Sequence, residues 1–326
     1  PKNHEALVKA VSEVQKNTVV VVMCGGCITM PWIDDVRGVL YTYLGGEAVG
    51  TATLDLLFGD VNPSGKLAET FPRRLEDNPS YLYFFGDEQN KTEYREGVFV
   101  GYRYYDKKNM DVLFPFGYGL SYTTFEYSNL TLDKSEMKDT DTLTVSVNVR
   151  NTGKVKGKEV VQLYVAKPES HTIRPVKELR GFEKIELEPG EEKNVTFTLA
   201  KRAFAYYRTD ISDWYVESGD YTIMAAKSSR DIACTATVNV TSTTQIKRVY
   251  TMNSTIEEIM ESPVGREILG KMMAQNPLAQ ADADDIGMGE AMARMMAEMP
   301  LRALLSFGGD SVPAGAGEML LKQLNA

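Results

Sequence analysis

Two cysteines separated by two residues form the pattern in this sequence that most directly suggests chemistry. Cys24 and Cys27 enclose two glycines and follow a run of β-branched residues. Such a pair at the end of a strand can lower a thiol pKa and support redox chemistry. A closed zinc site needs four ligands, and the remaining Cys and His residues are Cys234, His4 and His171. A thiol oxidoreductase is therefore one hypothesis, whereas we expect no metal and surface positions for both His.

Three charged residues near apolar or aromatic neighbours are further candidates for a specific role. Glu47 follows a glycine pair, and Arg95 and Glu96 lie in a segment rich in Tyr and Phe. We interpret all three as partners in ion pairs between domains rather than as catalytic groups.

The first 60 residues have the pattern of alternating helices and strands. Residues 1–16 predict an amphipathic helix, 18–24 a strand buried on both faces, 33–43 a short helix and strand or a single helix, and 47–58 a helix stopped by Gly59. This order predicts part of a parallel sheet with helices on both faces. At most three strands are present, so we expect the missing strands to precede Pro1. The helix positions expected to face inward are Leu7, Val8, Val11, Val14, Val49, Ala52, Leu56 and Leu57.

The periodicity changes to two from about Phe125, after a connector rich in aromatic residues that we interpret as a brace between domains. Alternating segments such as 143–149 and 194–199 are separated by turns such as Pro189-Gly190. About seven short strands at this spacing predict an antiparallel β-sandwich.

The composition changes again after Thr241. Ser254 and Glu257 have the spacing of a capping box, Ser262-Pro263 starts a second helix through Met273, and 279–289 looks flexible. Further helical pieces are predicted at 290–299 and 318–324. This Met-rich tail is interpreted as a helical appendage docked on its own protein, with an adaptable binding groove as the alternative.

The charge balance limits the kinds of partner. Lys and Arg number 36 against 45 Asp and Glu, a net charge of −9. Nucleic acids and anionic lipids favour basic patches, so neither is expected as a partner. The longest early apolar run, 19–23, is far too short to span a bilayer. With three Cys and no signal-like start, a cytoplasmic location is favoured over a secreted one, and a homo-oligomer is compatible with the sequence.

Several motifs occur together and in a consistent order. LFGDVNPSGKLAETFP runs from Leu57 to Pro72, YREGVFVGYRYY from Tyr94 to Tyr105 and FPFGYGLSY from Phe114 to Tyr122, and ELRGFEKI begins at Glu178. From about Leu7 to Val240 the sequence thereby resembles the C-terminal half of family 3 glycoside hydrolases, especially bacterial β-glucosidases. With the resemblance, the sequence predicts an incomplete parallel α/β sandwich domain at 1–72 and a fibronectin III-like β-sandwich at 125–242. The patterns described above add the aromatic-rich connector at 73–124 and the helical C-terminal tail at 243–326, which lies beyond the resemblance.

The resemblance also indicates what this chain lacks. In family 3 the nucleophile is an Asp on a (β/α)8 barrel, and the acid/base is typically a Glu in a Gly-Glu-Gly-like motif of the sheet domain. Retaining hydrolysis needs both carboxyl groups about 5 Å apart. Neither motif is present here, so no catalytic residue is expected in this chain, and no cofactor. The expected partners are the N-terminal barrel of the same enzyme and a β-linked glycoside.

Asp213 and Trp32 are the two remaining candidates for a role in a sugar site. Asp213, in Ser-Asp-Trp, matches the letters around the family nucleophile but lies in a predicted hairpin of the sandwich, so we interpret it as an exposed turn residue. Trp32 ends the loop after strand 18–24, where ligands of parallel sheets bind. It is a candidate to rim a sugar site, and the alternative is a core residue that anchors the next helix.

The leading hypothesis is thus the C-terminal region of a retaining β-glucosidase that supports the catalytic site without supplying its carboxylates. A non-catalytic carbohydrate- or partner-binding sandwich is the alternative from another class.

Overall fold

The computed structural model describes residues 2–84, 91–246, 248–274, 294–307 and 315–325. The chain forms two compact units, Pro1–Thr244 and Gln245–Ala326. None of the helices in these ranges is long and apolar enough to cross a membrane.

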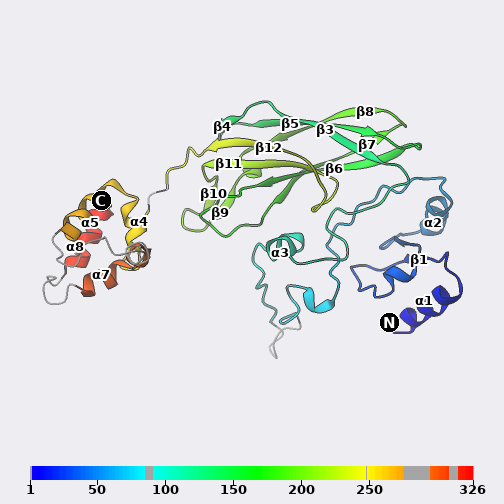
Figure 1. Cartoon of the computed structure of the whole chain (residues 1–326), viewed down its shortest axis with the longest axis horizontal. Helices are drawn as coiled ribbons and strands as arrows, with labels where there is room; N and C mark the ends of the chain where they lie inside the picture. The colour runs from blue at the N-terminus through cyan, green and yellow to red at the C-terminus, as the bar shows by residue number, and fades with distance from the viewer. Residues whose placement is uncertain (1, 85–90, 247, 275–293, 308–314, 326) are drawn as a thin grey trace, which may run out of the picture. The chain divides into compact units, whose positions relative to one another are not determined.

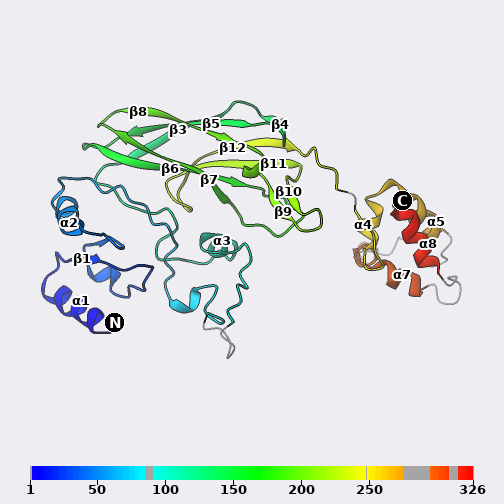
Figure 2. The same cartoon turned by 180° about the vertical axis from the view of Figure 1, so that it is seen from behind.

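The first part of unit Pro1–Thr244 is a small α/β segment. Strands β1 and β2 pair in parallel, with Val19 opposite Gly38 and Val22 opposite Tyr41. Helices α1 and α2 lie on opposite sides of β1 in both views (Figures 1 and 2). Gly59 ends the second helix with a φ of 84°, a left-handed conformation that glycine adopts without strain. The predicted element order is confirmed: α1 (Lys2–Val14), β1 (Val19–Val22), η1 (Ile33–Asp35), β2 (Gly38–Tyr41) and α2 (Val49–Phe58).

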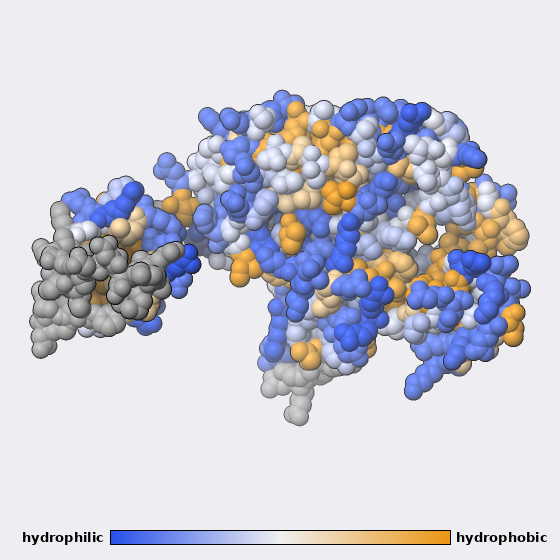
Figure 3. Space-filling view, in the orientation of Figure 1, coloured by the Kyte–Doolittle hydropathy of each residue, from blue (hydrophilic) through white to orange (hydrophobic). Residues whose placement is uncertain are grey.

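The prediction that β1 is buried on both faces and that the apolar helix positions face inward is wrong. Val19 is 48% exposed and Val21 37%, so β1 is not covered on both faces. No residue of α2 is buried. The sheet formed by β1 and β2 has only two strands in the described part of the chain. A sheet this narrow cannot cover the apolar faces of the two helices, and the helices cannot bury both faces of its strands. The space-filling view shows the resulting apolar surface (Figure 3). The exposed positions that we expected inside are Leu7, Val11, Val14, Ala52 and Leu57.

In the structure the connector between this segment and the sandwich spans residues 59–124, from the end of α2 to the start of the first sandwich strand. It contains η2 (Leu75–Asp77) and α3 (Tyr102–Lys107), and an antiparallel bridge joins Phe71 to Phe114 within it. The bridge places the rings of these two residues 6.1 Å apart, centroid to centroid. The connector therefore folds back on itself instead of running extended between the two domains.

The β-sandwich has more strands than expected. One sheet has the order β4-β12-β11-β6-β7 and the other β3-β5-β8, and β9 and β10 form a separate hairpin (Figure 1). The sandwich was predicted to be antiparallel throughout, but β4 pairs with β12 in parallel. The strands are β3 (Phe125–Leu132), β4 (Glu136–Lys138), β5 (Leu143–Asn151), β6 (Gly157–Ala166), β7 (Glu178–Leu187), β8 (Glu192–Leu199), β9 (Tyr206–Arg208), β10 (Asp213–Tyr215), β11 (Gly219–Ala226) and β12 (Ile232–Thr241).

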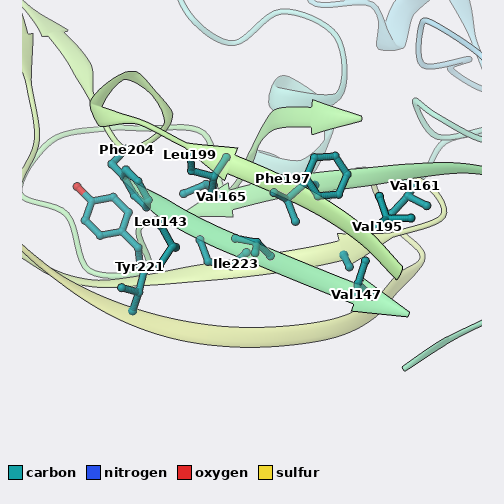
Figure 4. Close-up of a cluster of buried hydrophobic side chains, with 14 of the residues drawn as sticks. Leu143, Val147, Val161, Val165, Val195, Phe197, Leu199, Phe204, Tyr221 and Ile223 are labelled. Atoms are coloured by element: carbon teal, nitrogen blue, oxygen red, sulfur yellow. The ribbon is translucent and has the colours of Figure 1, made fainter. Parts of the chain in front are cut away.

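The alternation of apolar and polar residues in the sequence determines which side chains enter the core of the sandwich. In β5 every second residue from Leu143 to Asn151 is buried, while the residues between are half-buried or exposed. The inward side chains of both sheets meet in a single apolar layer (Figure 4). Phe204 and Tyr221 close one end of this layer with an edge-to-face contact at 5.3 Å.

Unit Gln245–Ala326 is helical, with an apolar core of its own. The capping box predicted at Ser254 and Glu257 lies one residue later, because the Thr255 hydroxyl accepts from the Glu258 amide and the Glu258 carboxylate accepts from the Thr255 amide. Segment 279–289 and the start of 290–299 lie outside the described residues. The described helices are α4 (Ile256–Met260), α5 (Pro263–Ala274), α7 (Leu301–Phe307) and α8 (Ala316–Leu324).

Candidate functional site

The candidate site lies at the carboxyl edge of the two parallel strands. β1 and β2 run in the same direction, so the loops that follow them leave at the same edge. The Thr42 amide donates to the Val22 carbonyl at 2.9 Å, and the Tyr41 hydroxyl donates to the Gly26 carbonyl. These bonds tie the two loops together. Ligands of open parallel sheets bind at this edge, beyond the ends of the strands.

Aromatic hydroxyls and one carboxylate gather at this edge. The rings of Tyr41 and Tyr43 are 4.8 Å apart, and Tyr41 also contacts Phe71 at 5.1 Å. Burial and, after it, the neighbouring Glu69 carboxylate together raise the pKa of Tyr43 to about 12. Burial likewise raises the pKa of Tyr41. Both phenols are therefore neutral at pH 7 and can donate hydrogen bonds.

The cysteine pair lies at the same edge but lacks the properties of a redox centre. Cys24 and Cys27 are both free thiols. Burial raises the pKa of Cys27, and the charge of Glu69 beside it raises this pKa further. A catalytic thiol needs the opposite shift, toward the thiolate. In the described residues, no group of three or more His, Cys, Asp or Glu is arranged to hold a metal ion.

Trp32 lies beneath this edge. It is 7% exposed and belongs to a small core with Val22, Met30 and Phe71. It also directly precedes η1, where the Trp32 carbonyl accepts from the Asp35 amide at 3.0 Å. This position fits the anchoring role, and a sugar-rim role for Trp32 stays a prediction.

The remaining candidates lie elsewhere. Asp213 is exposed at the start of β10, where its carboxylate accepts a hydrogen bond from the Trp214 amide, and Trp214 packs against the sandwich core. His4 is exposed, and the side chain of His171 is 99% exposed. Neither His nor Asp213 is brought to the carboxyl edge of the parallel strands.

The expected ion pairs between domains are not found at the three charged candidates. Arg95 instead pairs locally with Glu93, at 2.6 Å and near the surface. In the described ranges no ion pair is seen for Glu47, and a carboxylate oxygen of Glu96 is buried without a hydrogen-bond partner. Sequence position alone could not predict these contacts, because they depend on how the connector folds back.

A different ion pair joins the connector to the sandwich. Lys66 Nζ lies 3.3 Å from a Glu159 carboxylate oxygen, with side-chain exposures of 14% and 3%. The other oxygen of Glu159 accepts from the Tyr127 hydroxyl at 3.0 Å, and Lys66 donates to the Gly119 carbonyl at 3.2 Å. The sequence analysis missed both charged residues. Two sequence features could have indicated them. Lys66 stands within the PSGKL motif, and Glu159 directly precedes apolar residues of β6.

Two amide side chains complete this brace. Asn62 accepts from the Ser121 hydroxyl and the Tyr122 amide and donates to the Lys156 carbonyl at 3.1 Å. Gln162 in β6 donates to the Gly117 carbonyl at 3.0 Å. The α/β segment and the sandwich are thus joined through buried or half-buried polar contacts of the connector.

The fold and the brace define the class of protein: a parallel α/β segment joined by an aromatic connector to a fibronectin III-like sandwich. Residues 1–122 match the glycosyl hydrolase family 3 C-terminal domain, and residues 159–229 match the fibronectin type III-like domain. The chain belongs to glycoside hydrolase family 3, of which it is a C-terminal portion.

Relatives support this placement over almost the whole chain. The thermostable β-glucosidase B of Acetivibrio thermocellus is 51% identical over 326 residues, which cover 100% of this chain and 43% of the relative. The exo-α-(1→6)-L-arabinopyranosidase of Bifidobacterium breve is 40% identical over 95% of this chain and 40% of its own length. The crystal structure of the Bifidobacterium adolescentis family 3 β-glucosidase aligns with a TM-score of 0.73 at 41% identity, over 82% of this chain and 39% of that one. The chain therefore spans less than half of each of these relatives.

Proposed function

We propose that this chain is the supporting part of a retaining β-glucosidase that removes terminal β-linked glucose. The observation that carries the proposal is the 51% identity to the Acetivibrio thermocellus β-glucosidase along the full 326 residues. In this proposal the two catalytic carboxylates come from a part of the enzyme that this chain does not match, including an N-terminal (β/α)8 barrel. No organic cofactor or metal is needed, because one carboxyl group attacks the anomeric carbon and the other protonates the leaving oxygen.

The role of this chain is to hold the sheet domain of that enzyme in position. The buried pair of Lys66 and Glu159 and the amides of Asn62 and Gln162 fix the connector on the sandwich. The connector in turn pairs with itself at Phe71, next to the carboxyl edge of β1 and β2. A geometry error of about 1 Å at the reacting carboxylates costs about a hundredfold in rate, so such a brace matters for catalysis. Trp32 would stabilise the loop at this edge from below.

The test is a fusion of this chain to the N-terminal portion of the Acetivibrio thermocellus relative that it does not match. We expect the chain alone to leave 4-nitrophenyl β-D-glucopyranoside intact and the fusion to hydrolyse it. The fusion with Asp213→Asn should be as active as the unmodified fusion, because Asp213 is exposed on the hairpin of β9 and β10 and not at the parallel strands. Hydrolysis by the chain alone that is lost with Asp213→Asn would refute the proposal.

A second sugar specificity is favoured by one observation. An arabinopyranosidase of Bifidobacterium breve matches 95% of this chain at 40% identity. The same fusion assayed on 4-nitrophenyl α-L-arabinopyranoside would compare the two specificities. Because the N-terminal portion supplies most sugar contacts in this proposal, we expect the ratio of the two activities to follow the N-terminal donor used.

A non-catalytic carbohydrate-binding sandwich is the competing function. It requires residues 125–242 to bind a glycan without the rest of the enzyme. Titration of the chain with cello-oligosaccharides by calorimetry would reveal it, and we expect no heat of binding. A thiol oxidoreductase is disfavoured by the raised pKa of Cys27.

A further inference from the structure

Three arginines converge on one glutamate where α3 meets β7. Arg103 lies on α3, Arg174 precedes β7, and Arg180 lies within that strand. Arg180 Nη2 is 2.7 Å from a Glu178 carboxylate oxygen, whereas the nearest nitrogens of Arg174 and Arg103 are 3.7 and 3.8 Å from this carboxylate. Only one of the three guanidinium groups is therefore within hydrogen-bond distance of it. We call Arg103, Arg174, Glu178 and Arg180 the arginine cluster.

The cluster carries a surplus of positive charge. Three guanidinium groups face one carboxylate, so its net charge is +2, in a chain whose total is −9. One neighbouring carboxylate, Asp106, does not compensate this surplus, because it is already paired with both Lys177, at 2.7 Å, and Arg230, at 3.0 Å. These three residues line a pocket of about 400 Å³ whose lining does not include the four residues of the cluster.

Several donors of the cluster are unused. Nη1 of Arg174 and Nε of Arg103 and Arg180 are buried without a hydrogen-bond partner in the described residues. The side chain of Arg174 is only 9% exposed, and its guanidinium group lies 5.2 Å from the centroid of the Tyr206 ring. Burial lowers the pKa of Arg180; Glu178 opposes this shift, and the charges of Arg174 and Arg103 add to it. Unpaired buried donors and repelling cations are costly, so a ligand that pairs with them would be favoured.

We propose that the arginine cluster binds a small oxyanion such as inorganic phosphate. The planar guanidinium fork matches the geometry of phosphate and carboxylate oxygens, and charge-assisted hydrogen bonds of this kind are the strong ones. The three unused nitrogens are themselves buried, and the ligand approaches from solvent at the exposed parts of Arg103 and Arg180, whose side chains are 34% and 20% exposed. Its charge would complement the surplus of two positive charges. The oxyanion has two sources: a free ion, or a carboxylate of the longer enzyme.

The test measures phosphate binding by calorimetry and by thermal unfolding, at constant ionic strength set with chloride. We expect 10 mM phosphate to raise the melting temperature of unit Pro1–Thr244 by a few degrees, as for a ligand that binds the folded state with millimolar or higher affinity. Arg103→Gln should weaken binding about tenfold or more, because one charge-assisted hydrogen bond is lost. Arg103→Lys should restore part of the affinity, since it keeps the charge but loses the fork.

A matched control separates this site from general charge effects. Arg73 pairs with Asp111 on the surface and is 53% exposed, so Arg73→Gln removes the same charge elsewhere. Phosphate affinity should stay unchanged in this variant. No phosphate binding by the unmodified chain would overturn the proposal, as would equal losses in Arg73→Gln and Arg103→Gln.

The fusion to the N-terminal portion of the Acetivibrio thermocellus relative distinguishes the two sources of the oxyanion. Phosphate binding is measured by calorimetry and does not depend on whether the fusion hydrolyses a glycoside. Binding by both the chain and the fusion supports a free oxyanion as the ligand. Binding by the chain but not by the fusion supports a carboxylate of the enzyme itself as the occupant. Failure of the fusion to hydrolyse glucosides would leave this measurement unaffected.

Discussion

At the scale of single residues, the buried ion pair of Lys66 and Glu159 is one of the contacts that hold the connector on the sandwich. Glu159 is 3% exposed, and its charge is compensated by Lys66 and by the Tyr127 hydroxyl. A buried charge that loses its partner is strongly destabilising, whereas replacing both partners of such a pair is much less costly. The stability of this junction therefore depends on keeping the pair complete.

Lys66→Met should lower the free energy of unfolding by about 3–5 kcal/mol, because Glu159 is left buried and unpaired. The measurement is urea unfolding followed by tryptophan fluorescence, which reports on unit Pro1–Thr244 alone since both tryptophans, Trp32 and Trp214, lie in it. Lys156→Met is the control: Lys156 is 50% exposed in its pairs with glutamates, so its loss should cost less than about 1 kcal/mol. Equal losses in the two variants would contradict this account.

A second buried carboxylate makes the stability of the sandwich depend on pH. Asp139 is fully buried, and its carboxylate accepts from the Thr243 amide at 2.8 Å and lies 3.5 Å from Lys201. Burial opposes ionisation, but these partners outweigh it and keep the pKa of Asp139 below its ordinary value. A pKa that is lower in the folded state contributes stability above the unfolded value, about 3.9, and loses it as the pH falls through the folded value.

Asp139→Asn should therefore destabilise unit Pro1–Thr244 by about 1–3 kcal/mol at pH 7, with a smaller difference from the unmodified chain below pH 4. Thermal unfolding of both proteins between pH 3 and 7 measures this. Asp210→Asn is the control, because Asp210 is exposed beside Arg208 and its loss should have little effect at any pH. A difference between Asp139→Asn and the unmodified chain that grew on acidification would show that the sign is wrong.

The thiol of Cys27 should react slowly. Its pKa is raised by burial and by Glu69, so the reactive thiolate is scarce at neutral pH. Alkylation with iodoacetamide at pH 7, followed by mass spectrometry, should label Cys27 more slowly than a free small-molecule thiol. Labelling at the rate of the free thiol would revive the oxidoreductase hypothesis.

At the scale of elements, Gly119 allows the two halves of the connector to pack backbone to backbone. A Cβ atom on Gly119 would lie 2.3 Å from the Gly65 carbonyl oxygen, a distance that real Cβ atoms do not adopt. The amide of Leu67 also donates to the Tyr118 carbonyl at 2.8 Å. This close approach brings Lys66 within reach of Glu159.

Gly119→Ala should lower the free energy of unfolding by about 1–3 kcal/mol, because the two backbones must move apart. The matched control is Gly50→Ala in α2, where no atom lies within 4 Å of the added Cβ. That change should be neutral or stabilising by up to about 1 kcal/mol, since alanine favours a helix. Urea unfolding compares the two, and a Gly119→Ala variant as stable as Gly50→Ala would exclude a close-packed connector.

At the scale of the whole molecule, the chain consists of two units with separate apolar cores. In unit Gln245–Ala326 the ends are tied together, because Asn325 accepts from the Tyr250 amide at 2.7 Å and donates to its carbonyl at 2.9 Å. Ile259, Leu269 and Leu301 are fully buried in its core. Each unit thus has the contacts needed to fold by itself.

Removal of residues 245–326 should leave the urea midpoint of unit Pro1–Thr244 unchanged within about 0.3 M, since the apolar clusters of that unit contain none of these residues. The separate 245–326 fragment should show a helical circular dichroism spectrum and its own thermal transition. A midpoint that falls by more than about 1 M on truncation would show that the two units stabilise each other.

Much of this arrangement could be read from the sequence because it depends on local pattern. The alternation in 143–149 sets which side chains of β5 enter the core, and Gly59 ends α2 because its left-handed conformation suits glycine. The family motifs gave the order of the domains. Their boundaries at 72/73, 124/125 and 242/243 remain predictions. Single-residue offsets, such as the capping box at Thr255 instead of Ser254, arise because adjacent hydroxyl residues have similar capping propensity.

The contacts that join distant segments were decided only by the tertiary structure. The pairing of Lys66 with Glu159 spans 93 residues, and the local pattern around either charge does not indicate its partner. The exposure of β1 and α2 likewise depends on how many strands lie beside them, which periodicity does not reveal. Sequence by itself determined the class and order of the elements, since those follow from short-range backbone and side-chain preferences. Tertiary structure decided the brace, the arginine cluster and the exposed faces, since these depend on which distant residues meet.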